Sequence, residues 1–248
     1  MGTTKLTRKE ILAEDPVHFA IIRFVEFFRT QGKVIGMAAI CMAVLAVGGY
    51  LGIDYLQGRE QQIQQQLARA LDIFHAKIDP NASEDPFAKG PEPVFRTDNA
   101  RYQAALKELA FVSSKYSTGK LGVTARYYQG LCFLRLGQNN EALRALEEVR
   151  HNTKDRTLGY LAKKVLAGYY LTAKNWKASQ EILEGMIKDP QCDLPKDDLN
   201  LELARLADAQ GKREEALKLL RKSREENAGS GLQPLINQEI TRLESSAK

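Results

Sequence analysis

GQNNEAL, residues 137–143, returns as GKREEAL at residues 211–217. The two stretches lie 74 residues apart, which is twice 37. At the midpoint stands KNWKAS, residues 174–179, and one 37-residue step before Gly137 stands ARYQAAL, residues 100–106. Because repetition at a fixed period of about 20 to 50 residues is the signature of a solenoid, we expect four copies of one structural unit.

The copies share a pattern that predicts helical hairpins. Gly137 and Gly211 stand where a helix can end on a residue in the left-handed conformation. Five positions on comes a small residue that lets two helices cross closely, and four residues later a leucine on the same helix face. The small residues are Ala105, Ala142, Ser179 and Ala216, and the leucines are Leu109, Leu146, Leu183 and Leu220.

This spacing of small and large residues is typical of tetratricopeptide (TPR) repeats, whose usual period is about 34 residues. Generic helical hairpins are the alternative. We predict an all-α fold with a TPR-like domain over residues 55–248. Four prolines interrupt it at 79–97, which predicts an inserted loop. A capping helix over 232–246 is expected to cover the last apolar face.

Val34–Ile53 is a run of 20 residues without a charged side chain. Its length matches the hydrocarbon core of a membrane, and no small-residue cleavage site of a signal peptide follows it. A buried core helix seldom runs so long without charge. We therefore predict a transmembrane helix over residues 34–54, placed before the TPR-type α-solenoid.

Lys and Arg counts orient this span. Six precede it and two, Arg59 and Arg69, stand among the next twenty residues. The N-terminus is thus predicted to be cytoplasmic and the C-terminal bulk to be translocated, which in a bacterium is the periplasmic side of the inner membrane. Gly48 and Gly52 form a small-xxx-small pair that permits helix contact within the membrane.

Residues 1–33 form the predicted cytoplasmic segment. Asp15-Pro16 is a helix-start signal, and residues 16–31 mix aromatic and charged side chains. We interpret them as an amphipathic interfacial helix ending before Gly32. Docking of its aromatic face on a membrane partner is the alternative.

Motifs of catalysis and metal binding are missing from the sequence. There is no H-E-x-x-H, G-x-S-x-G, Walker A or dinucleotide fingerprint. The three histidines are scattered, and the three cysteines form no C-x-x-C pair. The net charge of +5 is spread along the chain rather than gathered in a basic patch. We predict no enzyme activity, no cofactor or metal site, and no nucleic-acid partner.

Stacked hairpins form a concave groove lined by the first helix of each hairpin. Apolar anchors mixed with cations suit an extended peptide or a partner helix. Of the predicted lining, Leu131 and Leu134 are the two residues with the best claim to be core instead. The predicted groove residues are Tyr127, Leu131, Leu134, Arg135, Lys164, Leu171, Leu201 and Arg205.

The chain resembles the bacterial family of ancillary Sec-translocon subunits with a TPR-like periplasmic domain. The resemblance rests on RFVEFF at residues 23–28, on Gly32-Lys33, on the Gly-rich span and on the repeats. It implies a non-enzymatic adaptor beside the translocon that binds periplasmic chaperones or emerging polypeptides. The insertion at 79–97 and the residues before Asp15 depart from the family. An accessory subunit of a respiratory or photosynthetic complex, and a receptor facing the cytoplasm, are the alternatives.

Overall fold

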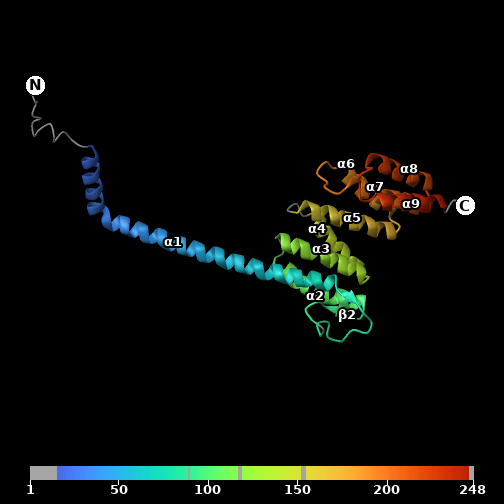
Figure 1. The fold of residues 1–248 in the computed structure, drawn as a ribbon, viewed down its shortest axis with the longest axis horizontal. Coiled ribbons are helices and arrows are strands. Elements are labelled where there is room, and N and C mark those ends of the chain that lie inside the picture. Colours follow the sequence, from blue (N-terminus) through green and yellow to red (C-terminus); the bar gives the residue numbers. More distant parts are fainter. Residues whose placement is uncertain (1–15, 89, 117–118, 152–154, 246–248) are drawn as a thin grey trace, which may run out of the picture. The chain divides into compact units, whose positions relative to one another are not determined.

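The computed structural model describes the backbone of residues 16–88, 90–116, 119–151 and 155–245. It divides into two compact units, Met1–Gln61 and Gln62–Lys248. The first helix, α1 (Pro16–Phe74), contributes residues to both (Figure 1). Each unit is described by itself.

In the first unit α1 is helical through Gly32, where the sequence predicted a helix end. A glycine in a helix interior costs only about 1 kcal/mol relative to alanine, which does not stop a helix with helix-forming residues on both sides. The large apolar side chains described in this unit are exposed, namely Ile21, Ile22, Phe24, Val25, Met37, Met42, Val44, Leu45, Val47 and Tyr50.

The predicted membrane span stays a prediction. Among the side chains that the structure describes, no helical stretch is long and apolar enough to cross a membrane. The interval 34–54 includes side chains at 34–35, 38–40 and 51–54 that lie outside the described set, Gly52 among them. At Gly48 an added Cβ would meet no atom within 4 Å.

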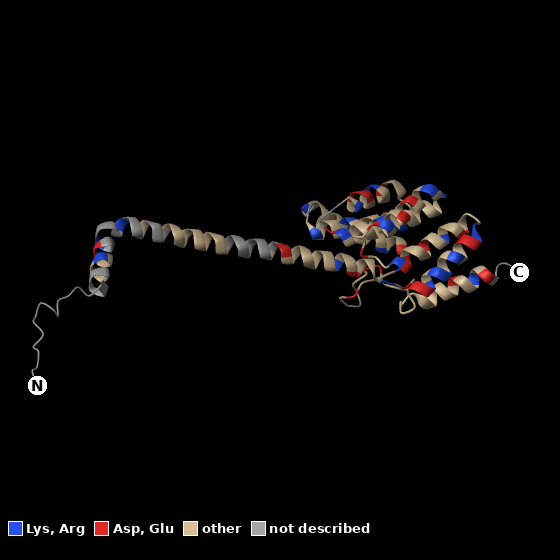
Figure 2. Cartoon of the chain, turned by 90° about the horizontal axis from the view of Figure 1, so that it is seen from above, with Lys and Arg blue, Asp and Glu red and all other residues tan. Residues whose placement is uncertain are grey.

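The second unit is an array of antiparallel hairpins, as the repeat predicts. Three of them pair α3 with α4, α5 with α6, and α7 with α8, and each helix packs on the next. The bounds are α2 (Asp98–Lys115), α3 (Lys120–Arg135), α4 (Asn139–Arg150), α5 (Arg156–Thr172), α6 (Trp176–Lys188), α7 (Lys196–Ala209), α8 (Arg213–Glu226) and α9 (Gln233–Ser245). Figure 2 shows acidic and basic residues interspersed along these helices.

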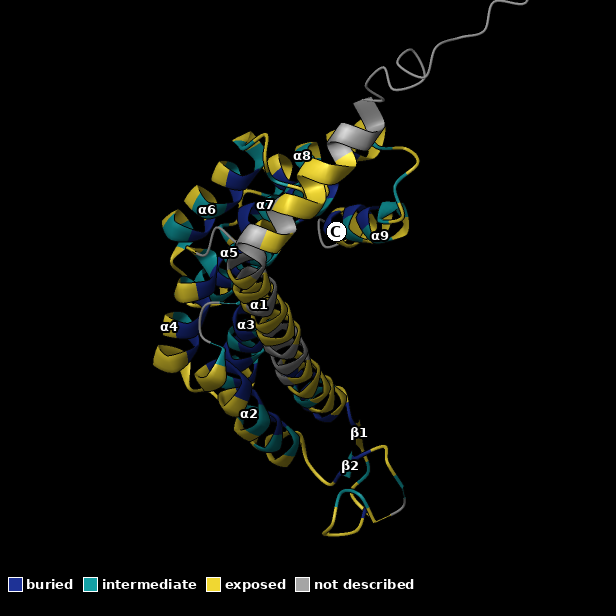
Figure 3. Ribbon diagram, turned by 90° about the vertical axis from the view of Figure 1, so that its left-hand side faces the viewer, coloured by how far each residue is buried: buried dark blue, intermediate teal, exposed yellow. Residues whose placement is uncertain are grey.

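The helices form two layers. Figure 3 shows α2, α4 and α6 along the outer side of the array, and α3, α5 and α7 along its inner side with their buried surfaces turned toward the outer helices. Contacts also run directly from α3 to α5 and from α5 to α7. We call the surface formed by the end of α1 together with α3, α5, α7 and α9 the inner face.

Three turns repeat the same backbone geometry at the 37-residue period. Gly137, Lys174 and Gly211 all have positive φ, at 74°, 59° and 77°. After each, the next N–H bonds to a carbonyl five residues back, as in Gln138 N–H to Phe133 O at 2.9 Å and Asn175 N–H to Tyr170 O at 2.8 Å. This is the Schellman pattern of a helix end, which Lys174 adopts without being glycine.

The predicted close crossings are present. The four small residues and the four leucines of the repeat are all buried, with no side chain more than 1% exposed. Ser179, the one polar member, donates its hydroxyl to Ala167 O at 2.9 Å. Gly130 marks the tightest approach, because a Cβ there would lie 2.7 Å from Leu146 Cγ. These contacts confirm TPR-type packing of the hairpins.

The inserted loop is more ordered than its prolines predicted. α1 ends at Phe74, and β1 (Lys77–Ile78) pairs in parallel with β2 (Val94–Phe95), with Lys77 opposite Val94. Phe95 is buried, and the Arg96 Nε–H donates to Ala82 O at 2.7 Å. The strands were not expected from sequence, because two residues are too few to show an alternating pattern.

At the other end α9 lies on the segment predicted as a cap. Ile236, Ile240 and Leu243 are buried in one cluster with Leu201 and Leu220. Ion pairs flank this cluster, from Arg242 to Asp208 at 2.8 Å and from Arg221 to Glu244 at 2.7 Å. The helix thereby covers the last apolar face of the array.

Candidate protein-binding groove

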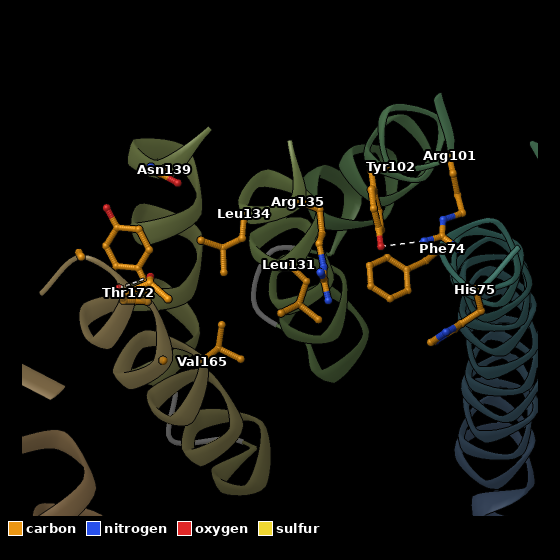
Figure 4. A pocket seen from close by; sticks show the side chains of 13 residues that line it. Phe74, His75, Arg101, Tyr102, Leu131, Leu134, Arg135, Asn139, Val165 and Thr172 are labelled. Carbon is orange, nitrogen blue, oxygen red and sulfur yellow. Dashed lines mark hydrogen bonds between the residues drawn. The ribbon is translucent and has the colours of Figure 1, made fainter. Parts of the chain in front are cut away.

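A groove of about 790 Å³ opens on the inner face where the C-terminal ends of α1, α3 and α5 meet (Figure 4). We call it the inner groove. It is large enough for a segment of a partner, since ligand sites typically measure about 300–1,000 Å³. Its lining consists of Phe74, His75, Arg101, Tyr102, Leu131, Leu134, Arg135, Asn139, Val165, Gly168, Tyr169, Thr172 and Ala173.

The surface of the inner groove is apolar between α3 and α5. Leu131, Leu134 and Val165 are only partly buried, and Figure 4 shows them directed into the space between these helices. Gly168 leaves the space open, because an added Cβ there would meet no atom within 4 Å. Burial of exposed apolar surface of this kind under a partner is favourable, because it removes that surface from water.

Aromatic rings form the α1 side of the groove. The Phe74 ring lies 5.6 Å from Tyr102 and 5.1 Å from Tyr128, centroid to centroid, in tilted and edge-to-face arrangements. These are the geometries that aromatic quadrupoles favour. The rings therefore hold one another in place before any partner arrives.

Arg101 belongs to the scaffold of this wall. Its guanidinium donates to Ala76 O at 2.7 Å, to Asp98 at 2.6 Å and to the Tyr102 hydroxyl at 2.7 Å. It also lies 4.6 Å from the centre of the Tyr102 ring. These contacts tie the end of α1 to the start of α2, so the Arg101 charge is already engaged.

Arg135 is the other arginine of the groove, and it is exposed. Among the residues that the structure describes, it has no hydrogen-bond or ion-pair partner, and Figure 4 shows its side chain between Leu131 and Phe74. The lining contains no Asp or Glu. The inner groove thus carries a cation with no carboxylate beside it.

The inner groove brings together three of the predicted binding residues, Leu131, Leu134 and Arg135. Tyr127 instead packs against the cluster between α3 and α5, where burial raises the pKa of its hydroxyl, with a smaller contribution from Tyr128. Leu171 packs against the cluster between α5 and α7. Neither residue lines the groove.

Leu201 is a correction to the predicted lining. It is 1% exposed and belongs to the core under α9. Its position on a first helix was correctly inferred, but the docking of α9 covers it. A capping helix covers part of the inner face, and sequence periodicity does not show which residues it covers.

The remaining predicted cations, Lys164 and Arg205, have partners within the chain. Lys164 contacts Asp198 at 2.5 Å, and Arg205 contacts Glu202 at 3.1 Å and Glu239 at 3.4 Å. Each pair joins α5 to α7 or α7 to α9, apart from the Glu202 contact within α7. These ion pairs join neighbouring helices of the inner face, so both cations already have a carboxylate partner within the chain.

The other lining residues were not predicted from sequence, namely Phe74, His75, Arg101, Tyr102, Asn139, Val165, Gly168, Tyr169, Thr172 and Ala173. One signal was present, because adding the 37-residue period to Leu131 and Arg135 gives Gly168 and Thr172, which both line the groove. The insertion breaks the period before residue 98, so Phe74 and His75 could not be placed by counting.

The described residues offer no reactive centre around the groove. They contain no group of three His, Cys, Asp or Glu side chains able to hold a metal ion. Burial raises the pKa of the nearby Cys132 thiol to about 12, although the Arg101 charge opposes the shift. A thiol that stays protonated is a poor nucleophile.

No family model and no curated protein matches the chain. Two similar solved structures show nearly identical TPR-like repeats from a Podosopora anserina protein described as a kinesin light chain. Both are 20% identical in sequence and cover 60% of this chain and 80% of theirs, with TM-scores of 0.49 and 0.48. The TPR-type assignment rests on the repeated turns and crossings described above.

Proposed function

We propose that this chain is a non-enzymatic adaptor that binds a polypeptide segment of a protein partner in the inner groove. The observation that carries the proposal is an open apolar groove on the first-helix face, with a rigid aromatic wall and an arginine that lacks a partner among the described residues. TPR-type folds commonly present extended inner surfaces of this kind to peptides and partner helices.

The proposal extends to the location of the adaptor. Residues 34–54 would anchor it in a bacterial inner membrane, with residues 1–33 in the cytoplasm and the repeat domain in the periplasm. Support comes from the uncharged run Val34–Ile53, the charge asymmetry around it and the exposed apolar side chains of the first unit. The resemblance in sequence to ancillary translocon subunits supports a position beside the Sec translocon.

A mild-detergent pull-down tests both parts with four baits: the full chain, a chain lacking residues 1–54, full-length Gly168→Leu and a full-length control. Leucine at 168 adds an apolar side chain to the lining of the groove, at a position where an added Cβ would meet no atom within 4 Å. The matched control is Gly185→Leu in α6, where an added Cβ also meets nothing within 4 Å.

We expect translocon subunits with the full chain and their loss when residues 1–54 are removed. We expect Gly168→Leu to lose soluble partners that Gly185→Leu retains. Recovery of one unrelated membrane complex at fixed stoichiometry would refute the translocon role and identify an accessory subunit of that complex. Identical partner sets from both leucine variants would refute binding in the inner groove.

A further inference from the structure

We propose that the inner groove selects partner segments in which a carboxylate is flanked by apolar side chains, and that Arg135 is the residue that binds this carboxylate. This inference rests on the proposed function, because it names the chemistry of the polypeptide that the groove would bind. It concerns specificity, so it can fail while binding in the groove stands.

The charge of the inner groove is one-sided. Its lining contains no acidic residue, and Arg135 is its one arginine without a partner among the described residues, because Arg101 is paired with Asp98. A hollow surface lined by one sign of charge concentrates the field and favours ligands of the opposite sign. A basic segment would meet Arg135 with nothing to neutralise it, so the groove discriminates against such segments.

On the rest of the inner face, two cations are paired with carboxylates from the next first helix or from the cap. Lys164 on α5 is met by Asp198 on α7, and Arg205 on α7 is met by Glu239 on α9, each 34 residues further along the chain. The residue 34 positions after Arg135 is Tyr169 on α5, which lines the groove and brings no charge. A carboxylate from outside the chain would supply the missing partner.

Arginine is suited to this task because its planar guanidinium binds a carboxylate through two parallel hydrogen bonds. Arg101 does not compete, since its terminal nitrogens already donate to Ala76, Asp98 and Tyr102. Recognition of a single carboxylate therefore falls to Arg135. Leu131, Leu134 and Val165 would contact the apolar neighbours of that carboxylate.

The length of the segment follows from the spacing of the helices. The groove runs across α1, α3 and α5, which is two interhelical steps of about 8–10 Å. An extended chain covers about 16–20 Å with roughly five or six residues at 3.3–3.6 Å each. The expected ligand is thus a short extended segment with one or two acidic side chains among apolar ones.

The test uses the full chain in mild detergent and three fluorescein-labelled hexapeptides. They share one apolar sequence and differ at a central position, which is Glu, Gln or Lys. Fluorescence anisotropy measures the dissociation constants at low and at high salt. We expect the Glu peptide to bind at least tenfold more tightly than the Lys peptide, with Gln between them, and the preference to shrink at high salt.

Two substitutions assign the preference to Arg135. Arg135→Glu should reverse the order, so that the Lys peptide binds best. The control Arg144→Glu removes an exposed arginine of α4 that does not line the groove, and it should leave the order unchanged. An unchanged order in Arg135→Glu, or the same reversal in both variants, would overturn the assignment.

A third substitution supplies the missing carboxylate from within the chain. Tyr169→Glu places an acid at the position where the other two pairs carry one, and should weaken binding of the Glu peptide about tenfold. Tyr169→Phe keeps the ring and should bind as the parent does. If Tyr169→Glu binds the Glu peptide as tightly as the parent, Arg135 does not bind the carboxylate.

Gly168→Leu separates failure of this inference from failure of the proposed function. If all three peptides bind equally and Gly168→Leu abolishes their binding, the groove binds polypeptide and the acidic preference is wrong. If no peptide binds the parent chain, both proposals fail. Displacement of the Glu peptide by dihexanoyl phosphatidylglycerol below its micelle concentration, at equal potency, would also overturn the inference, because the groove would then recognise a lipid headgroup.

Discussion

The inner face has two halves that differ in a single respect, namely what covers them. In the first half, between α1, α3 and α5, Leu131 is half-buried and Arg135 is exposed beside an open groove. In the second half, between α5, α7 and α9, Leu201 is fully buried and Arg205 is ion-paired with Glu239. The same residue types thus lie open at the groove or hold the fold together, depending on whether the next helix reaches them.

In this array the capping helix α9 packs on the last part of the inner face. α9 places Ile236, Ile240 and Glu239 where a partner could otherwise lie. The apolar and ionic contacts that α9 makes are the kind that we expect a partner to make further along. We can therefore test the open half by comparing it with the closed one.

Truncation of a leucine in each half should give the largest contrast in stability. Leu201→Ala should cost about 2–5 kcal/mol in the free energy of unfolding, because a fully buried leucine leaves a cavity. Leu131→Ala should cost about 1 kcal/mol or less, because that side chain lines the groove and is only half-buried. Chemical denaturation of the full chain in mild detergent measures both. Equal losses would contradict the division into an open and a closed half.

Replacement of the arginines should give a smaller contrast of the same sign. Arg205→Met leaves Glu202 without its cation and leaves Glu239 paired with Arg242 alone, and should cost about 1 kcal/mol. Arg135→Met removes no contact within the described chain and should change stability by less than about 0.5 kcal/mol. Thermal unfolding monitored by circular dichroism resolves the two. A larger loss at Arg135 would mean that its side chain supports the fold.

The smallest expected effect is a pH dependence from the contact between α5 and the end of α6. The Tyr160 hydroxyl donates to the Asp189 carboxylate at 2.6 Å, and this bond with burial raises the pKa of Tyr160 to about 12. The same bond, with the Gln191 N–H, lowers the pKa of Asp189. A raised tyrosine pKa means that the stabilisation is complete below about pH 10 and is lost as pH rises through about 12.

Tyr160→Phe isolates this contribution. The difference in Tm between the parent and Tyr160→Phe should be constant from neutral pH to about pH 10 and should shrink between about pH 10 and 12. On the acid side, the Asp189 contribution should fade as pH drops through its lowered pKa. A Tm difference that stays the same across the alkaline range would show that the hydroxyl bond does not stabilise the array.

The repeat was predictable from sequence because its constraints are local. Gly137 and Gly211 signal a left-handed turn by residue type, and the 37-residue period carries that geometry to Lys174, whose type would not predict it. The small residues and leucines of the crossings follow for the same reason. Each such position depends on its own hairpin, which is contained in a short stretch of chain.

The site was only partly predictable because it depends on contacts between hairpins. Leu131 and Leu201 are the same residue type on first helices of their hairpins, and Leu201 is core in a cluster to which α9 contributes Ile236, Ile240 and Leu243. Phe74 reaches the groove across an insertion that removes it from the period. Arg205 has Glu202 three positions before it and Glu239 34 positions after it, where Arg135 has Cys132 and Tyr169, and the second difference has meaning once the helices are seen side by side.

Site-specific photocrosslinking in native membranes can show whether a polypeptide occupies the inner groove. A benzophenone amino acid replaces Leu131 in the inner groove or Glu225 on the exposed surface of α8, each with and without Gly168→Leu. We predict that position 131 crosslinks to a polypeptide, that Gly168→Leu removes the product, and that position 225 gives no product sensitive to Gly168→Leu. If crosslinking at position 131 is absent, or persists when leucine fills the groove, the inner groove is not the site of partner binding.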